Sequence, residues 1–193
     1  MKATTNIPAC LLMTTLAGWA SWAFAHARLD PTKSLKPRSD SSGLKTAPCG
    51  DVAATTDASK RTELVAGSTL TIEWQETIDH PGWFRIAFSP DGETGFDDNV
   101  LKDDITDDKD GSGIRYDDPS TYVAFKTTIK VPDEPCEGCS IQLIQVMTDR
   151  NPPTNYYSCA DIRIIADDGS EAEKPATPTG LKVTGKRLTI GGD

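Results

Sequence analysis

The sequence is poor in histidine, in basic charge and in long apolar runs. It has two histidines in 193 residues, and 20 Lys and Arg against 29 Asp and Glu give a formal net charge of −9. Nucleic-acid phosphates and anionic lipids repel such an acidic chain, so we expect neither a nucleic-acid nor a membrane partner. No second cysteine pair and no histidine pair stands at ligand spacing, which argues against a zinc site.

The N-terminal residues have the pattern of an export signal. An apolar run follows Lys2 and ends at the small-x-small sequence Ala23-Phe24-Ala25. This run is too short for a membrane-spanning helix, and no second apolar stretch follows it. We therefore predict a signal peptide over residues 1–25, cleavage between Ala25 and His26, and a secreted or periplasmic protein.

Cleavage at that point would make one of the two histidines the N-terminal residue. His26 would then offer a primary amine and an imidazole from one position, which together form a bidentate nitrogen chelate. An α-amino group has a pKa of about 8, so a metal displaces its proton at neutral pH at little cost. With the imidazole of His80 as a third nitrogen the set suits Cu(II), and we predict one copper per chain. Taken alone, His80 is equally compatible with an ordinary surface or core histidine.

Four cysteines remain once Cys10 is removed with the signal. An even number in an exported chain indicates two disulfides, for which three pairings are possible. A Cys-Glu-Gly-Cys turn can bring its ends within about 5–7 Å, so we favour Cys136–Cys139 together with Cys49–Cys159. A redox Cys-x-x-Cys site is disfavoured because no βαβ pattern surrounds it.

Short segments of alternating apolar and polar residues predict an all-β domain. Strands are expected at Thr69–Gln75, Trp83–Ser89, Thr121–Val131, Ser140–Met147 and Tyr156–Ile165. Residues 26–66 are predicted to be irregular and residues 93–120 to form a long acidic loop. The whole favours an antiparallel β-sandwich with long loops, of immunoglobulin or fibronectin III type, over residues 26–166. Residues 167–193 are predicted to be a flexible, charged, proline-containing tail.

One part of the acidic loop loosely resembles a calcium-binding loop. Asp108–Gly113 has the alternation of acidic residues and glycine that such loops use. Pro119, however, stands where a bidentate carboxylate is expected. We therefore expect a solvated, charged loop.

Four features occur in an order that is typical of one protein family. They are His26 directly after the signal, HPGWFRIAFS from residue 80, CEGCSIQLIQ from residue 136 and YYSCADIRI from residue 156. Together they resemble the lytic polysaccharide monooxygenases, in particular the chitin-binding type-4 and bacterial branches, over residues 26–165. The resemblance implies a copper enzyme that cleaves the glycosidic bonds of a polysaccharide such as chitin or cellulose. It would use O₂ or H₂O₂ and a small-molecule or protein electron donor, and we expect a monomer.

The resemblance also assigns roles to single residues. His26 would supply its amine and one imidazole nitrogen to copper, and His80 the third nitrogen. Tyr156, three residues before Cys159, falls where the family has its axial aromatic residue, and ordinary core packing is its alternative role. Gln145 is the second candidate catalytic residue, because a polar side chain near the reacting oxygen can hydrogen-bond to it.

Further candidates and alternatives remain open at this stage. Glu76 and Asp79 lie close to His80 in sequence and could support the site, or be ordinary loop residues. Trp83 could stack on a sugar ring or be buried. The chain has no obvious flat aromatic cluster, and Thr154 stands where many members carry Gln or Glu. A non-catalytic copper carrier with the same ligands is the alternative function, and a carbohydrate-binding sandwich without metal is the third.

Overall fold

The computed structural model describes residues 26–168, so the predicted signal peptide and all but two residues of the predicted tail lie outside the described part. No helix in this part is long and apolar enough to cross a membrane. Its elements are β1 (Ala27–Leu29), η1 (Ala58–Lys60), β2 (Thr62–Val65), β3 (Thr69–Glu76), β4 (Gly82–Ser89), β5 (Val100–Thr106), η2 (Pro119–Thr121), β6 (Val123–Lys130), β7 (Cys136–Met147) and β8 (Thr154–Ile165).

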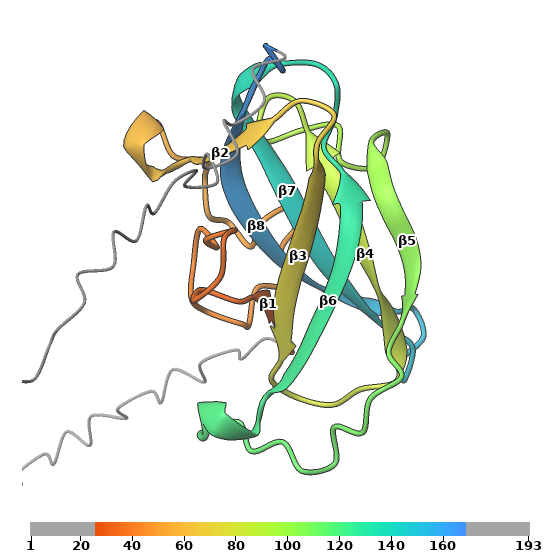
Figure 1. Ribbon diagram of the computed structural model, residues 1–193. Helices are drawn as coiled ribbons and strands as arrows, with labels where there is room; N and C mark the ends of the chain where they lie inside the picture. Colours follow the sequence, from red (N-terminus) through yellow and green to blue (C-terminus); the bar gives the residue numbers. More distant parts are fainter. Residues whose placement is uncertain (1–25, 169–193) are drawn as a thin grey trace, which may run out of the picture.

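The strands form two sheets that pack face to face (Figure 1). One sheet has the order β1-β3-β6 and the other the order β2-β8-β7-β4-β5. The pairings are antiparallel except for β2 with β8, which run parallel at one edge of the larger sheet. The predicted all-β sandwich is confirmed, and this parallel pair is a feature that the sequence did not indicate.

Three strands lie in segments that were predicted to be irregular or looped. β1 and β2 lie within residues 26–66, and β5 lies within the acidic segment 93–120. All three are at sheet edges. β1 and β2 are only three and four residues long, and β5 has no fully buried side chain. The strand predicted to begin at Thr121 begins at Val123 instead, because Pro119–Thr121 form a single 3₁₀ turn.

The core lies between the two sheets and is centred on three aromatic rings. The ring centroid of Trp74 in β3 lies 5.2 Å from that of Phe84 in β4 and 5.7 Å from that of Phe125 in β6. The centroids of the two Phe rings are 4.9 Å apart. Each ring removes apolar area from water, and full burial of a Phe side chain stabilises the fold by about 1.5–3 kcal/mol. Because these rings come from both sheets, they fix how the sheets face each other.

The segment after β1 runs along β8, the last strand of the domain. The backbone N–H of Arg38 donates to the carbonyl of Cys159 at 2.7 Å, and that of Tyr157 donates to the carbonyl of Leu44 at 2.9 Å. The disulfide Cys49–Cys159 closes this contact. Both expected disulfides are present, since Cys136 and Cys139 are also bonded. The N-terminal segment is thus fixed to the C-terminal strand.

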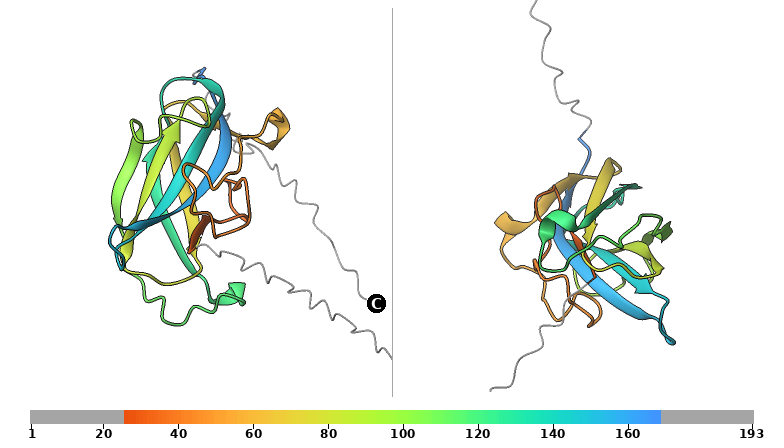
Figure 2. Two further views of the ribbon diagram at one scale, coloured as in Figure 1. Left: turned by 180° about the vertical axis from the view of Figure 1, so that it is seen from behind. Right: turned by 90° about the horizontal axis from the view of Figure 1, so that it is seen from below.

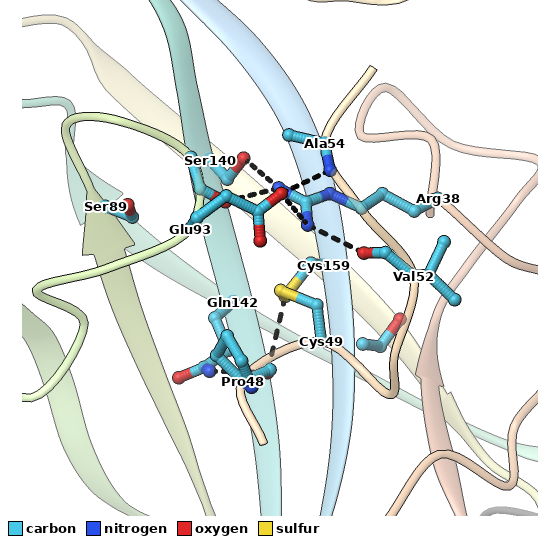
Figure 3. Close-up of a disulfide and its surroundings, with 12 residues drawn as sticks. Arg38, Pro48, Cys49, Val52, Ala54, Ser89, Glu93, Ser140, Gln142 and Cys159 are labelled. Atoms are coloured by element: carbon cyan, nitrogen blue, oxygen red, sulfur yellow. Dashed lines mark hydrogen bonds and ion pairs between the residues drawn. A yellow bond between two sulfur atoms is a disulfide. The ribbon is translucent and has the colours of Figure 1, made fainter. Parts of the chain in front are cut away.

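A buried ion pair lies beside that disulfide (Figure 3). The side chain of Arg38 is 3% exposed, and its Nε donates to Oδ1 of Asp161 at 2.8 Å. The other guanidinium nitrogens donate to the carbonyls of Val52 and Gly92 and to the hydroxyl of Ser140. The second oxygen of Asp161 accepts the backbone N–H of Thr55 at 2.9 Å. The partly exposed carboxylate of Glu93 also lies 3.5 Å from Nη1 of Arg38. The buried guanidinium is therefore surrounded by carboxylates and hydrogen-bond acceptors.

Candidate metal centre

One end of the sandwich collects the start of β1, the end of β3, the β3–β4 loop, the segment after β5 and the β7–β8 hairpin. This is the lower end in Figure 1, and the right-hand view of Figure 2 looks onto it. β1 pairs with β3 so that Ala27 lies opposite Glu76. The carbonyl of His26 accepts the backbone N–H of Thr77 at 2.7 Å. The backbone thereby holds His26, the residue that the predicted cleavage would make N-terminal, at the end of β3.

The rings of His26, His80 and Tyr156 form one cluster. The centroids of the two imidazole rings are 4.3 Å apart, with an interplanar angle of 30°. The Tyr156 ring lies 4.0 Å from that of His26, tilted by 39°, and the residue is 2% exposed. Three residues chosen from distant parts of the sequence are therefore brought together.

His80 is oriented by a carboxylate from the β7–β8 hairpin. Its Nδ1 lies 3.1 Å from Oδ2 of Asp149. A carboxylate in this position keeps the proton on Nδ1 and leaves the lone pair of Nε2 available, an arrangement common among metal-binding histidines. The donor set of two clustered imidazoles, one of them oriented in this way, fits a nitrogen-ligated copper. Sequence reasoning missed Asp149, because a single acidic residue in a turn carries no signal of its distant partner.

Gln145 lies beside Tyr156 and bonds to another of the candidates. The two residues are partners in the β7–β8 ladder. Gln145 is 1% exposed, and its Nε2 donates to Oε1 of Glu76 at 2.8 Å. A buried amide–carboxyl pair therefore lies behind the ring cluster, and the structure joins two residues that the sequence suggested separately.

Glu76 also belongs to a group of three carboxyl groups. One oxygen each from Glu76, Asp79 and Asp107 lies within 4.8 Å of the others. Burial is the largest of the effects that raise the pKa of Glu76 to about 8. The charge of Asp107, a hydrogen bond between Asp107 and Glu76, and the charge of Asp79 raise this pKa further. The backbone N–H of His80 lowers it. Burial also raises the pKa of Asp107. Sequence reasoning placed Asp107 in a solvated loop, so its proximity to Glu76 was not expected.

Trp83, Tyr122 and Tyr157 are half-buried at the described surface. Tyr116 is the one aromatic side chain among the exposed large apolar residues of this part. Trp83, the candidate for sugar stacking, is half-buried in β4 between β5 and β7. These observations leave the ring cluster as the main feature of this end of the fold.

Some solved structures are similar to this chain at low sequence identity. One is a lytic polysaccharide monooxygenase AA15 from Thermobia domestica in the Cu(I) state, with 17% identity, 72% of each chain covered and a TM-score of 0.39. Another is an AA10 lytic polysaccharide monooxygenase from Streptomyces lividans, with 13% identity, 71% of this chain and 81% of that chain covered, and a TM-score of 0.34. Such values carry no conclusion about activity.

Sequence comparison is more informative. A curated "Lytic cellulose monooxygenase" of Streptomyces ambofaciens is 28% identical over 130 residues, which are 65% of this chain and 32% of that protein, so the chain spans about a third of that relative's length. Residues 7–162 match the family model described as "Lytic polysaccharide mono-oxygenase, cellulose-degrading". Since that match covers most of the chain, the protein belongs to the lytic polysaccharide monooxygenase family.

Proposed function

We propose that this protein is a copper-dependent monooxygenase that cleaves the glycosidic bonds of a polysaccharide oxidatively, with cellulose as its substrate. The proposal rests on one observation: the rings of His80 and Tyr156 both pack on the ring of His26 in a chain that belongs to this family. Cellulose is favoured over chitin because both the family description and the curated relative's name refer to it.

In this proposal each residue of the cluster has a separate task. The amine and imidazole of His26 and the imidazole of His80 would hold one copper, which supplies the redox chemistry with O₂ or H₂O₂ and an external reductant. Asp149 keeps His80 in the tautomer that can bind a metal. Tyr156, packed on the His26 ring, would lie beside the copper and restrict access from that side. Gln145, held by Glu76, would position a hydrogen bond at the site.

The proposal requires processing at the N-terminus. The nitrogen of His26 becomes a primary amine only when residues 1–25 are removed, so we propose export followed by cleavage at Ala25–His26. The working unit would be a monomeric domain of residues 26–166, followed by a charged tail over 167–193.

The copper site is tested by Cu(II) titration with EPR. Protein that begins at His26 is compared with a version that carries one extra N-terminal residue. We expect one-to-one binding and an axial, nitrogen-rich spectrum for the first, and weaker binding with a changed spectrum for the second. Binding that is indifferent to the extra residue would contradict the proposed ligand set.

The activity is tested with ascorbate and amorphous cellulose, with chitin in parallel, and mass spectrometry of the released oligosaccharides. We expect oxidised products from cellulose, and none from the variant His80→Ala. Tight copper binding without oxidised products from either glycan would instead identify a copper carrier.

A further inference from the structure

Three carboxyl groups near the ring cluster have no protein cation to balance them. None of the ion pairs found among the described residues involves Glu76, Asp79 or Asp107. Buried carboxylates without a partner are costly, and bound cations are one way in which proteins compensate them. We propose that these three residues form a second metal site, for a hard divalent cation such as Ca²⁺ or Mn²⁺.

The spacing of the oxygens fits a single ion. They lie within 4.8 Å of one another. Ca²⁺ binds oxygens at about 2.3–2.6 Å, so two of its ligands can be up to about 5 Å apart. One ion can therefore contact all three carboxyl groups without a rearrangement of the backbone.

Unused acceptor atoms point into the cluster. Glu76 is fully buried, and its Oε1 is occupied by the amide of Gln145. Oε2 of Glu76 and both carboxylate oxygens of Asp107 are closed to water. Beyond a hydrogen bond between the two carboxyl groups and the backbone N–H of His80 beside Glu76, no donor among residues 26–168 is found for them. Buried acceptors are nearly always satisfied in folded proteins, so several oxygens that share so few donors would be stabilised by a bound cation.

The remaining coordination positions can be filled from solvent. Asp79 is exposed, so the cluster has a buried side and an open side. Ca²⁺ takes six to eight oxygens and commonly includes water among them. The segment after β5 packs closely on this side, since a Cβ added to Gly111 would lie 2.6 Å from the Cβ of Asp79. An ion here would tie the β3–β4 loop to that segment.

This site is chemically different from the proposed copper site. Its donors are all oxygen atoms, which hard cations prefer, whereas the clustered imidazoles favour copper. It also needs no free N-terminal amine. The two proposals can therefore fail independently.

The test uses the full mature chain with one extra N-terminal residue, which prevents the amine of His26 from binding copper. After removal of metals with EDTA, CaCl₂ is titrated at pH 7.5 by calorimetry, and Mn²⁺ binding is followed by EPR. We expect one saturable site, and a rise in Tm of roughly 5–10 °C at a hundredfold excess over Kd. The variants Glu76→Gln and Asp107→Asn should weaken binding by roughly tenfold or more.

Asp117→Asn is the matched control, because Asp117 is an exposed carboxylate of the same segment outside the cluster; it should bind as the parent does. Circular dichroism checks that each variant is folded. If Glu76→Gln does not fold, the cation binding of Asp107→Asn tests the proposed site. Absence of binding at 10 mM CaCl₂, or equal binding by all variants, would overturn the proposal and leave a proton shared between Glu76 and Asp107 as the compensation.

Discussion

Two buried groups of charged residues in this protein are built in opposite ways. Around Arg38 one cation faces Asp161, and backbone carbonyls and a hydroxyl accept its remaining hydrogens. Around Glu76 three carboxyl groups lie together, and none of them forms an ion pair with a Lys or Arg within residues 26–168. The first group lies against the Cys49–Cys159 disulfide and joins the N-terminal segment to β8; the second lies next to the clustered histidines.

The difference separates a structural from a functional role. A balanced, hydrogen-bonded ion pair holds its neighbours in one geometry, and loss of either partner is costly. A group of like charges does not stabilise the fold, and groups whose pKa values are perturbed in this way collect at functional sites. The Arg38 group supports the architecture, whereas the Glu76 group is the cation site proposed above.

The largest change in stability should come from removing the Cys49–Cys159 disulfide, which lies beside the Arg38 group. Cys49 and Cys159 are 110 residues apart, whereas Cys136 and Cys139 are separated by 3. Loop-closure entropy then predicts a loss of about 5 kcal/mol in the free energy of unfolding for Cys49→Ala with Cys159→Ala. The corresponding loss for the short loop is about 1.5 kcal/mol. Urea unfolding measures both, and equal losses would contradict the difference.

The second effect should come from the ion pair itself. Arg38→Met leaves Asp161 buried without its cation, and we expect the free energy of unfolding to fall by about 3–5 kcal/mol. Adding Asp161→Leu should recover part of the loss, because the stranded charge is removed. Lys36→Met, at an exposed position of the same segment, should change stability by less than about 0.5 kcal/mol. If the double variant is no more stable than Arg38→Met, the uncompensated charge of Asp161 does not explain the loss of stability.

A substitution in the Glu76 group should instead increase the free energy of unfolding. In metal-free protein at pH 8.5, Glu76→Gln should raise the free energy of unfolding by about 1 kcal/mol. The amide of Gln still accepts from Gln145 and can donate to Asp107, while one buried charge is removed. Urea unfolding in EDTA measures the change, and a loss of stability there would contradict the assignment.

The smallest effect concerns an exposed carboxylate near the Arg38 group. Hydrogen bonds lower the pKa of Asp91, first from the hydroxyl of Thr94 and then from the backbone N–H groups of Glu93 and Thr94 and the hydroxyl of Ser89. Because the folded pKa lies below the ordinary value of 3.8, its contribution is present above that pH and is lost as pH falls through the folded pKa. Asp91→Asn should therefore show a small loss in Tm at pH 7 that disappears in strong acid, whereas Asp117→Asn should show none.

Sequence reasoning succeeded where a side chain's type is itself informative. Apolar alternation located the central strands, because residues such as Ile72 and Trp74 must face the core. His26, His80 and Tyr156 were identified by their chemistry and family pattern, and the structure brings them together, although their roles remain a prediction. Asp107 and Asp149 were missed because an acidic residue in a loop looks solvated until its distant neighbours are known. The edge strands were missed because β1 and β2 are only three and four residues long and β5 has no fully buried side chain.

The contact between β1 and the last strand, β8, affects the order in which the domain folds. The backbone N–H of Leu29, in β1, donates to the hydroxyl of Ser158 at 3.1 Å across 129 positions of sequence. Contacts between such distant residues form slowly, because a long stretch of chain must be ordered before they are gained. Synthesis delivers β8 after every other strand, so β1 can complete its contacts only at a late stage of folding. His26, which directly precedes β1, would then reach His80 and Tyr156 only in a nearly complete domain.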